Sequence, residues 1–213
     1  MNIKFLADLR ALKAVLTVAS DEETRYYLNG VNVEVRKDGV TYCATDGHRL
    51  LVARQKGLNP DDVPPFIIPS KLIKSVKLKK STDLCDITVE GTRVTIHYLG
   101  ESIGADLIDG TFPDYRRVIP ATTNGKHANF NFDYLASFND AARLFRDDTK
   151  GNFKAYPIVH HNGDEPALVE FVLDEREGIE AVGVIMPVRV KQIKFEAPAW
   201  AVPAPAKKEE AGA

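Results

Sequence analysis

One order of predicted elements recurs three times along the 213 residues: a short strand, an amphipathic helix, and then several strands with alternating apolar and polar residues. Repetition of one supersecondary unit indicates an architecture that is built by joining neighbouring units. The units share little residue identity, so this repeat is inferred from pattern alone. We predict an α+β fold of about three units, each made of a strand, a helix and a small antiparallel sheet.

The first unit begins with a short strand at Met1–Phe5. Leucines and valines at helical spacing, with charged residues between them, predict a helix over Ala7–Ser20. The pair Asp46-Gly47 predicts a hairpin turn, because glycine accepts a positive φ without a Cβ clash. The strands predicted from alternation are Arg25–Val35, Gly39–Ala44 and Arg49–Arg54.

The other two units follow the same order. A second helix begins at Ser70, which is a typical N-cap residue, and runs to about Lys80. A third helix begins at Asp133 and runs to about Arg146. Residues 191–213 are rich in Pro, Ala and charge and are expected to form a mobile tail. The predicted strands are Phe66–Ile68, Asp83–Glu90, Arg93–Leu99 and Ser102–Ile108 in the second unit, and Asn129–Phe132, Asn152–His160, Ala167–Asp174 and Ile179–Val190 in the third.

Four segments of the chain resemble the bacterial DNA polymerase III beta subunit, the sliding clamp. They are Arg25–Gly30, Thr45–Leu50, Asp109–Pro120 and Val184–Val190, and the last resembles the family's Met-Pro-x-Arg-Leu ending. The resemblance implies a DNA-clamp fold. Residues 1–120 then form a complete domain like the family's middle domain, and residues 121–190 form a half domain like the end of its third. The family's first domain and the first half of its third have no counterpart here.

The resemblance also implies a pocket between these two domains for short extended peptides from polymerases, the clamp loader and repair proteins. The residue chemistry agrees, because Leu50 and Met186 can hold leucine or phenylalanine anchors while His48 and the arginines form a polar rim of donors. Taken singly, Phe112–Pro120 also fits a plain linker and Val184–Val190 also fits a buried strand. The implied pocket residues are Thr45, Gly47, His48, Arg49, Leu50, Pro113, Arg117, Val118, Val184, Met186, Pro187, Val188 and Arg189.

The distribution of charge indicates a second surface, although the formal net charge is only −2. The predicted second helix carries lysines and no acidic residue, and the helices of sliding clamps line the central hole. Lys and Arg there would contact the phosphates of double-stranded DNA without reading its sequence. A solvated lysine face is the alternative. The implied DNA contacts are Arg10, Lys13, Lys71, Lys74, Lys77, Lys79, Lys80, Arg143 and Arg146.

The function implied by the resemblance is that of a DNA sliding clamp, a processivity factor in DNA replication. The reduced size suggests a phage or another mobile element. A homo-oligomer is expected, because three units are too few for the family's ring, but a closed ring, a two-fold pair and a monomer or open dimer all stay open. The alternative functions are a clamp-like adaptor or decoy that does not encircle DNA, and a structural remnant.

One segment of the tail, Gln192–Phe195, loosely resembles a clamp-binding peptide.

Other kinds of site are not expected. The sequence shows no zinc spacing, P-loop or nucleophile elbow, so neither a metal, a cofactor nor enzymatic activity is expected. Cys43 and Cys85 are expected to be buried apolar residues. No apolar run spans a bilayer and charges interrupt the N-terminal leucines, so we expect a cytoplasmic, nucleoid-associated protein without contact to a membrane.

Overall fold

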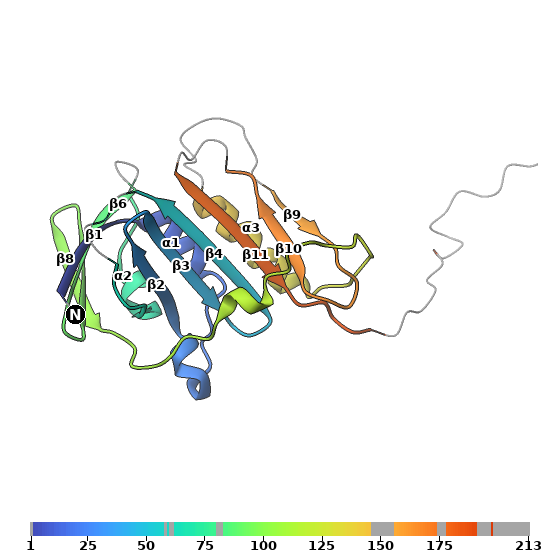
Figure 1. The fold of residues 1–213 in the computed structure, drawn as a ribbon, viewed down its shortest axis with the longest axis horizontal. Helices are drawn as coiled ribbons and strands as arrows, with labels where there is room; N and C mark the ends of the chain where they lie inside the picture. The colour runs from blue at the N-terminus through green and yellow to red at the C-terminus, as the bar shows by residue number, and fades with distance from the viewer. Residues whose placement is uncertain are drawn as a thin grey trace, which may run out of the picture.

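The protein is described by a computed structural model that places residues 2–57, 59, 62–79, 83–145, 156–173, 178–190 and 197. Over this part of the chain the strands form two antiparallel sheets, with helices packed against them (Figure 1). The elements are β1 (Asn2–Asp8), α1 (Leu9–Leu16), η1 (Glu23–Leu28), β2 (Gly30–Arg36), β3 (Gly39–Thr45), β4 (Arg49–Lys56), β5 (Phe66–Pro69), α2 (Ser70–Ser75), β6 (Leu84–Glu90), β7 (Arg93–Tyr98), β8 (Glu101–Asp106), η2 (Tyr115–Val118), α3 (Phe132–Phe145), β9 (Pro157–His160), β10 (Ala167–Phe171) and β11 (Ile179–Ile185).

The first two units exchange their first strands. β1 pairs along its whole length with β6 of the second unit, from Asn2 opposite Glu90 to Asp8 opposite Leu84. β5 of the second unit pairs in turn with β2 of the first. The resulting sheet orders are β1-β6-β7-β8 and β5-β2-β3-β4-β11-β10-β9. Each of the two units thus supplies a strand to the sheet of the other.

The third unit extends the larger sheet. β11 pairs antiparallel with β4, from Ile179 opposite Gln55 to Ile185 opposite Arg49. The sheet is therefore continuous across the border that the sequence predicted near residue 120. Figure 1 shows α1 and α3 together behind this sheet, with η2 on its opposite face.

Helix α1 lies at the centre of the main core. Its residues Leu9, Leu12 and Val15 are fully buried between the sheets and the other helices. Burying a side chain of this size stabilises the fold by about 1.5–3 kcal/mol. Asp8 caps the helix, since its Oδ1 accepts a hydrogen bond of 2.8 Å from the backbone N–H of Ala11.

The helix boundaries differ from the sequence prediction. α2 ends at Ser75 and not near Lys80, because Val76 adopts extended backbone and buries its side chain in the core. The predicted strand Asn129–Phe132 does not form. Asn131 instead precedes α3 and accepts a hydrogen bond of 2.9 Å from the N–H of Asp133, and the helix begins at Phe132, one residue earlier than predicted.

Other differences are smaller. The predicted strand Arg25–Val35 is divided into η1 and β2, and α1 is shorter than Ala7–Ser20. Some predicted features lie outside the described residues, namely Asn152–Ala155, Lys80, Arg146 and the tail peptide Gln192–Phe195.

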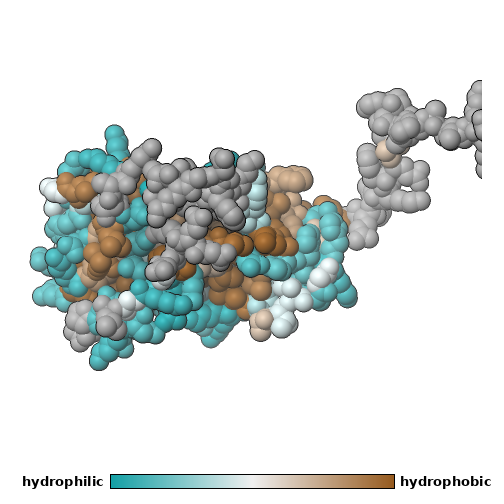
Figure 2. Space-filling view, turned by 90° about the horizontal axis from the view of Figure 1, so that it is seen from above, coloured by the Kyte–Doolittle hydropathy of each residue, from teal (hydrophilic) through white to brown (hydrophobic). Residues whose placement is uncertain are grey.

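The surface of the molecule carries apolar side chains in separate groups. On the face seen from above, where grey atoms do not cover it, hydrophilic side chains lie between these groups (Figure 2).

Candidate functional site

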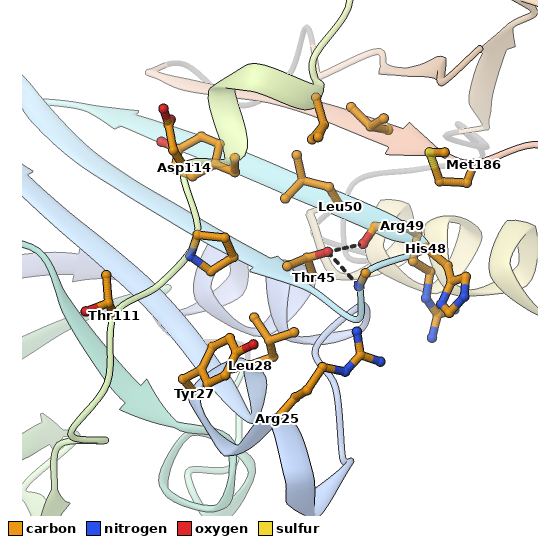
Figure 3. A pocket seen from close by; sticks show the side chains of 15 residues that line it. Arg25, Tyr27, Leu28, Thr45, His48, Arg49, Leu50, Thr111, Asp114 and Met186 are labelled. Atoms are coloured by element: carbon orange, nitrogen blue, oxygen red, sulfur yellow. Dashed lines mark hydrogen bonds between the residues drawn. The ribbon is translucent and has the colours of Figure 1, made fainter.

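A cavity of about 460 Å³ lies on the sheet face opposite α1, where β4, β11 and the connector at residues 107–120 meet (Figure 3). We call it the inter-unit pocket. Its size falls in the range of about 300–1,000 Å³ that is typical of ligand sites. It is lined by Arg25, Tyr27, Leu28, Thr45, Gly47, His48, Arg49, Leu50, Thr111, Pro113, Asp114, Tyr115, Val118, Val184 and Met186.

The β3–β4 loop forms one wall and is held by its own side chains. Asp46 Oδ1 accepts hydrogen bonds from the backbone N–H groups of His48 and Arg49, at 2.8 and 2.9 Å. Its Oδ2 accepts a hydrogen bond of 3.0 Å from Arg49 Nε. Thr45 Oγ1 donates to the Arg49 carbonyl at 2.7 Å and accepts from the Gly47 N–H at 3.0 Å (Figure 3). The loop is thus held in one conformation by hydrogen bonds from its own side chains.

Gly47 at the tip of this loop has a backbone conformation that favours glycine and lies close to Arg25. Its φ of +94° lies in the region that favours glycine. A Cβ at this position would also stand 2.6 Å from a guanidinium nitrogen of Arg25. Arg25 pairs at the surface with Glu22, whose carboxylate oxygens accept hydrogen bonds of 2.9 and 2.6 Å from its Nε and Nη2.

The end of β11 forms the opposite wall. The N–H of Met186 donates to the His48 carbonyl at 2.8 Å, which extends the β4–β11 ladder into the loop. Tyr134 of α3 supports this junction, because its ring centre lies 4.7 Å from the Arg49 guanidinium carbon and 5.7 Å from the His48 ring. One side of the pocket is therefore built from both predicted domains.

The floor of the pocket is apolar. Leu50, Val184 and Tyr115 are buried in a cluster separate from the main core. Above them, Met186 is 41% exposed and Val118 is 47% exposed. Methionine is unbranched and adapts to differently shaped partners. An apolar floor with exposed apolar side chains at its edge suits a leucine or phenylalanine side chain.

An ion pair anchors the connector to the sheet. Arg116 donates hydrogen bonds of 3.0 and 2.7 Å to the two carboxylate oxygens of buried Glu34. Burial by itself raises the pKa of Glu34, but the hydrogen bonds and charge of Arg116 outweigh it, so the pKa lies below its ordinary value. Burial raises the pKa of the neighbouring Tyr115 hydroxyl, and the Glu34 charge raises it further.

Most of the residues that the resemblance implied do line the inter-unit pocket; the exceptions are Arg117, Pro187, Val188 and Arg189. Arg117 is 83% exposed at its side chain and pairs with Asp114 at 2.9 Å. Beyond Met186 the chain leaves the ladder, and the Val188 N–H donates to the Asn129 carbonyl at 2.7 Å. The lining residues that the sequence analysis did not assign are Arg25, Tyr27, Leu28, Thr111, Asp114 and Tyr115.

The predicted DNA contacts fall into two groups. Arg10 is only 12% exposed and is paired with Asp83, and Lys13 donates to the Ile73 carbonyl at 2.8 Å. Burial lowers the pKa of Lys13. These contacts favour a structural role for both residues. Arg143 is exposed and pairs with Asp140 at 3.2 Å. The exposed lysines around α2 are Lys71, Lys74, Lys77 and Lys79, the last two beyond the helix end.

Other predicted features are as follows. Cys43 and Cys85 are buried free thiols, as predicted, and burial raises the pKa of Cys85 to about 12. Among the described residues, no group of three or more His, Cys, Asp or Glu side chains is placed to hold a metal ion. No helix in the described ranges is both long and apolar enough to cross a bilayer.

Comparisons with known proteins identify relatives of the chain. Residues 6–114 match the family model described as DNA polymerase III beta subunit, central domain. The chain is 33% identical to the beta sliding clamp of Caulobacter vibrioides over 141 residues, which cover 62% of this chain and 37% of that protein. It is 32% identical to the beta sliding clamp of Haemophilus influenzae over 181 residues, which cover 79% of this chain and 49% of that protein. The chain therefore spans less than half the length of either relative.

The fold is similar to that of solved structures as well. The DNA polymerase III subunit beta from Pseudomonas aeruginosa superposes with a TM-score of 0.65 and 20% identity, covering 88% of this chain and 67% of that one. The DNA polymerase sliding clamp from Bacillus subtilis superposes with a TM-score of 0.63 and 21% identity, and the match covers 90% of this chain and 65% of that one. At these identities the likeness concerns the fold.

Proposed function

Since this chain belongs to the DNA polymerase III beta subunit family, the sliding clamps, we propose that it is a processivity factor in DNA replication that holds partner peptides in the inter-unit pocket. The observation that carries the proposal is the meeting of the β3–β4 loop, the connector and the end of β11 around one apolar cavity. The partners are polymerases, clamp loaders or other proteins with a clamp-binding peptide.

The chemistry of the pocket suits an extended peptide. Leu50, Val184 and Val118 offer an apolar surface for leucine and phenylalanine anchors. His48 and Arg25 at the rim supply donors for a glutamine side chain or a peptide carbonyl. The loop hydrogen bonds preorganise this wall, so that binding orders few further side chains. Peptide binding and release need no catalytic step from these residues.

We propose further that the protein contacts duplex DNA through the lysines around α2. Lys71, Lys74, Lys77 and Lys79 are exposed and close together in sequence. Phosphate contacts made by lysine carry no sequence information, which suits a protein that moves along DNA. A homo-oligomer would place several such lysine groups around one duplex, and a non-encircling adaptor would use the pocket alone.

The pocket is tested by fluorescence polarization with a labelled peptide that carries one glutamine followed by leucine and phenylalanine anchors. Met186→Ala removes an exposed side chain at the edge of the pocket, and we expect it to weaken binding by about 1–3 kcal/mol. Leu50→Ala, at the floor, should weaken it by a similar amount.

The matched control for Met186→Ala is Leu6→Ala, which removes a similarly exposed apolar side chain on β1, away from the pocket. This control should leave peptide affinity unchanged. The thermal unfolding of each variant shows whether a loss of binding reflects a loss of fold. Equal affinity of the parent protein and Met186→Ala, with the fold intact, would contradict the assignment.

A further inference from the structure

A second cavity, of about 310 Å³, lies beside the connector over β2 and β5. We call it the β2 cavity. Thr111, Pro113, Asp114 and Tyr115 line both this cavity and the inter-unit pocket. These connector residues therefore form a partition with one cavity on each side. Pro113 and Asp114, in the middle of the partition, are exposed, so an extended chain could pass over them.

Asn32 of β2 is an unpartnered polar group in the wall of the β2 cavity. The residue is 3% exposed, and its neighbours Val31 and Val33 face the main core, so its side chain lies on the connector side of the sheet. Within the described part of the chain, its carboxamide makes no hydrogen bond. Its polar atoms are not among the fully buried side-chain atoms without a partner, so they are accessible from the cavity. The asparagine thus offers two donors and an acceptor to an occupant.

The charges around the cavity define the kind of occupant. Glu34 is satisfied by Arg116 through two hydrogen bonds. The carboxylate of Asp114 accepts a hydrogen bond of 2.9 Å from Arg117. A cationic ligand would have to displace an arginine, and an anionic ligand would face two carboxylates. A neutral amide fits best, because it can donate to and accept from the carboxamide of Asn32 at the same time.

We propose that the β2 cavity binds an asparagine or glutamine side chain in the flank of the same partner peptide that fills the inter-unit pocket. This inference rests on the proposed function of that pocket. The peptide crosses the connector at Pro113 and Asp114, so that its anchors lie on one side and its flanking amide on the other. The β2 cavity would then select among partners that share the same apolar anchors.

The test compares three kinds of peptide on the full-length protein by fluorescence polarization. The first carries the glutamine, leucine and phenylalanine anchors alone. The second adds a short flank with one asparagine or glutamine, placed at either end in separate peptides, and the third carries leucine in place of that flanking amide. We expect an amide flank at one end to tighten binding roughly three- to tenfold, as one or two hydrogen bonds to a neutral amide would. The leucine flank should give no such gain.

Asn32→Leu supplies the matched variant, since leucine has a similar size and no hydrogen-bonding group. It should bind the anchor-only peptide like the parent protein and lose the gain from the amide flank. A second readout does not depend on this variant folding: the side-chain amide signals of Asn32 in a ¹⁵N–¹H spectrum should shift with the amide-flanked peptide and not with the anchor-only peptide.

The outcomes separate the two proposals. If the anchor-only peptide fails to bind, the proposed function fails, and the β2 cavity inference fails with it. If the anchor-only peptide binds and neither amide flank adds affinity or moves the Asn32 signals, only the β2 cavity inference is overturned. A gain that Asn32→Leu retains in full would equally overturn it, because the flank would then be bound elsewhere.

Discussion

At the scale of single residues, Gly47 shows how one backbone conformation shapes the pocket wall. The loop tip needs a positive φ, and Arg25 occupies the space where a Cβ would stand. Substitution of Gly47 therefore has a conformational cost that any glycine with a positive φ would share. It also has a second effect, on the position of Arg25, that is specific to this site. Gly91 separates the two effects, because it also has a positive φ, of +60°, but open space around it.

We predict that Gly47→Ala and Gly91→Ala each destabilise the protein by about 1–2 kcal/mol, the usual cost of left-handed backbone for an L-residue. Only Gly47→Ala should also weaken peptide binding, since it displaces Arg25 at the rim. Thermal unfolding and fluorescence polarization on the two variants measure both effects. A loss of peptide affinity of the same size in Gly91→Ala would show that the effect is not local to the pocket.

The ion pair of Glu34 and Arg116 predicts a dependence of stability on pH. The pKa of Glu34 is lower in the folded protein than in the unfolded chain, so the pair stabilises the fold above the ordinary carboxyl pKa. That contribution is lost as the pH falls through the lowered pKa. We expect Glu34→Gln to flatten the change in unfolding free energy between about pH 5 and pH 3. Urea unfolding of both proteins across this range measures it.

Arg116→Ala is the complementary variant, because it leaves the Glu34 carboxylate buried without its partner. It should destabilise the protein at pH 7 by about 1–3 kcal/mol, the cost of an unsatisfied buried group. Acid unfolding of Glu34→Gln that follows the parent curve would show that the ion pair does not contribute in this way.

The residues of the pocket could be predicted from the sequence only in part. Thr45–Leu50 and Met186 carry recognisable family segments, and the structure does bring them together. Arg25, Tyr27 and Leu28 lay in another recognised segment, Arg25–Gly30, but nothing local shows that η1 turns toward the β3–β4 loop. Asn32 had no sequence signal at all, because one asparagine in an alternating strand is compatible with either face.

At the scale of elements, alternation of apolar and polar residues predicted most of the strands, since each has one face on a core. It could not predict their partners. The exchange of β1 and β5 between units depends on pairing between residues far apart in the sequence, such as Phe5 with Ile87. The end of α2 was also missed, because the lysines after Ser75 favour a helix locally and the burial of Val76 overrides that preference.

The exposed lysines on and just after α2 are close together in sequence, which predicts how DNA binding responds to substitution. Lys71→Glu with Lys74→Glu should lower duplex affinity and reduce the slope of log affinity against log salt by about 0.9 for each phosphate that the protein no longer neutralises. The matched control is Lys37→Glu with Lys126→Glu, which reverses two exposed lysines that lie outside the helices and strands. Affinity measured over a series of salt concentrations provides the slopes, and equal weakening in both double variants would remove α2 from the interface.

At the scale of the whole molecule, the pocket forms where the third unit joins the first, because β11 pairs with β4 in one continuous sheet. Neither the first two units nor the third has a complete pocket, because β11 and the residue after it supply Val184 and Met186 while η1, the loop and the connector supply the rest. The solution mass then distinguishes the two forms of the proposed function. A stable multiple of 23.6 kDa supports a clamp that surrounds DNA, and a monomer supports a non-encircling adaptor.

The most direct test of the central claim is photo-cross-linking with an anchor peptide that carries a photoreactive group on its leucine. The account predicts cross-links, located by mass spectrometry, to the β3–β4 loop, to the connector and to the end of β11, all suppressed by excess unlabelled peptide. Cross-links confined to one of these segments, or placed elsewhere on the protein and equally suppressed, would contradict a single pocket shared by all three.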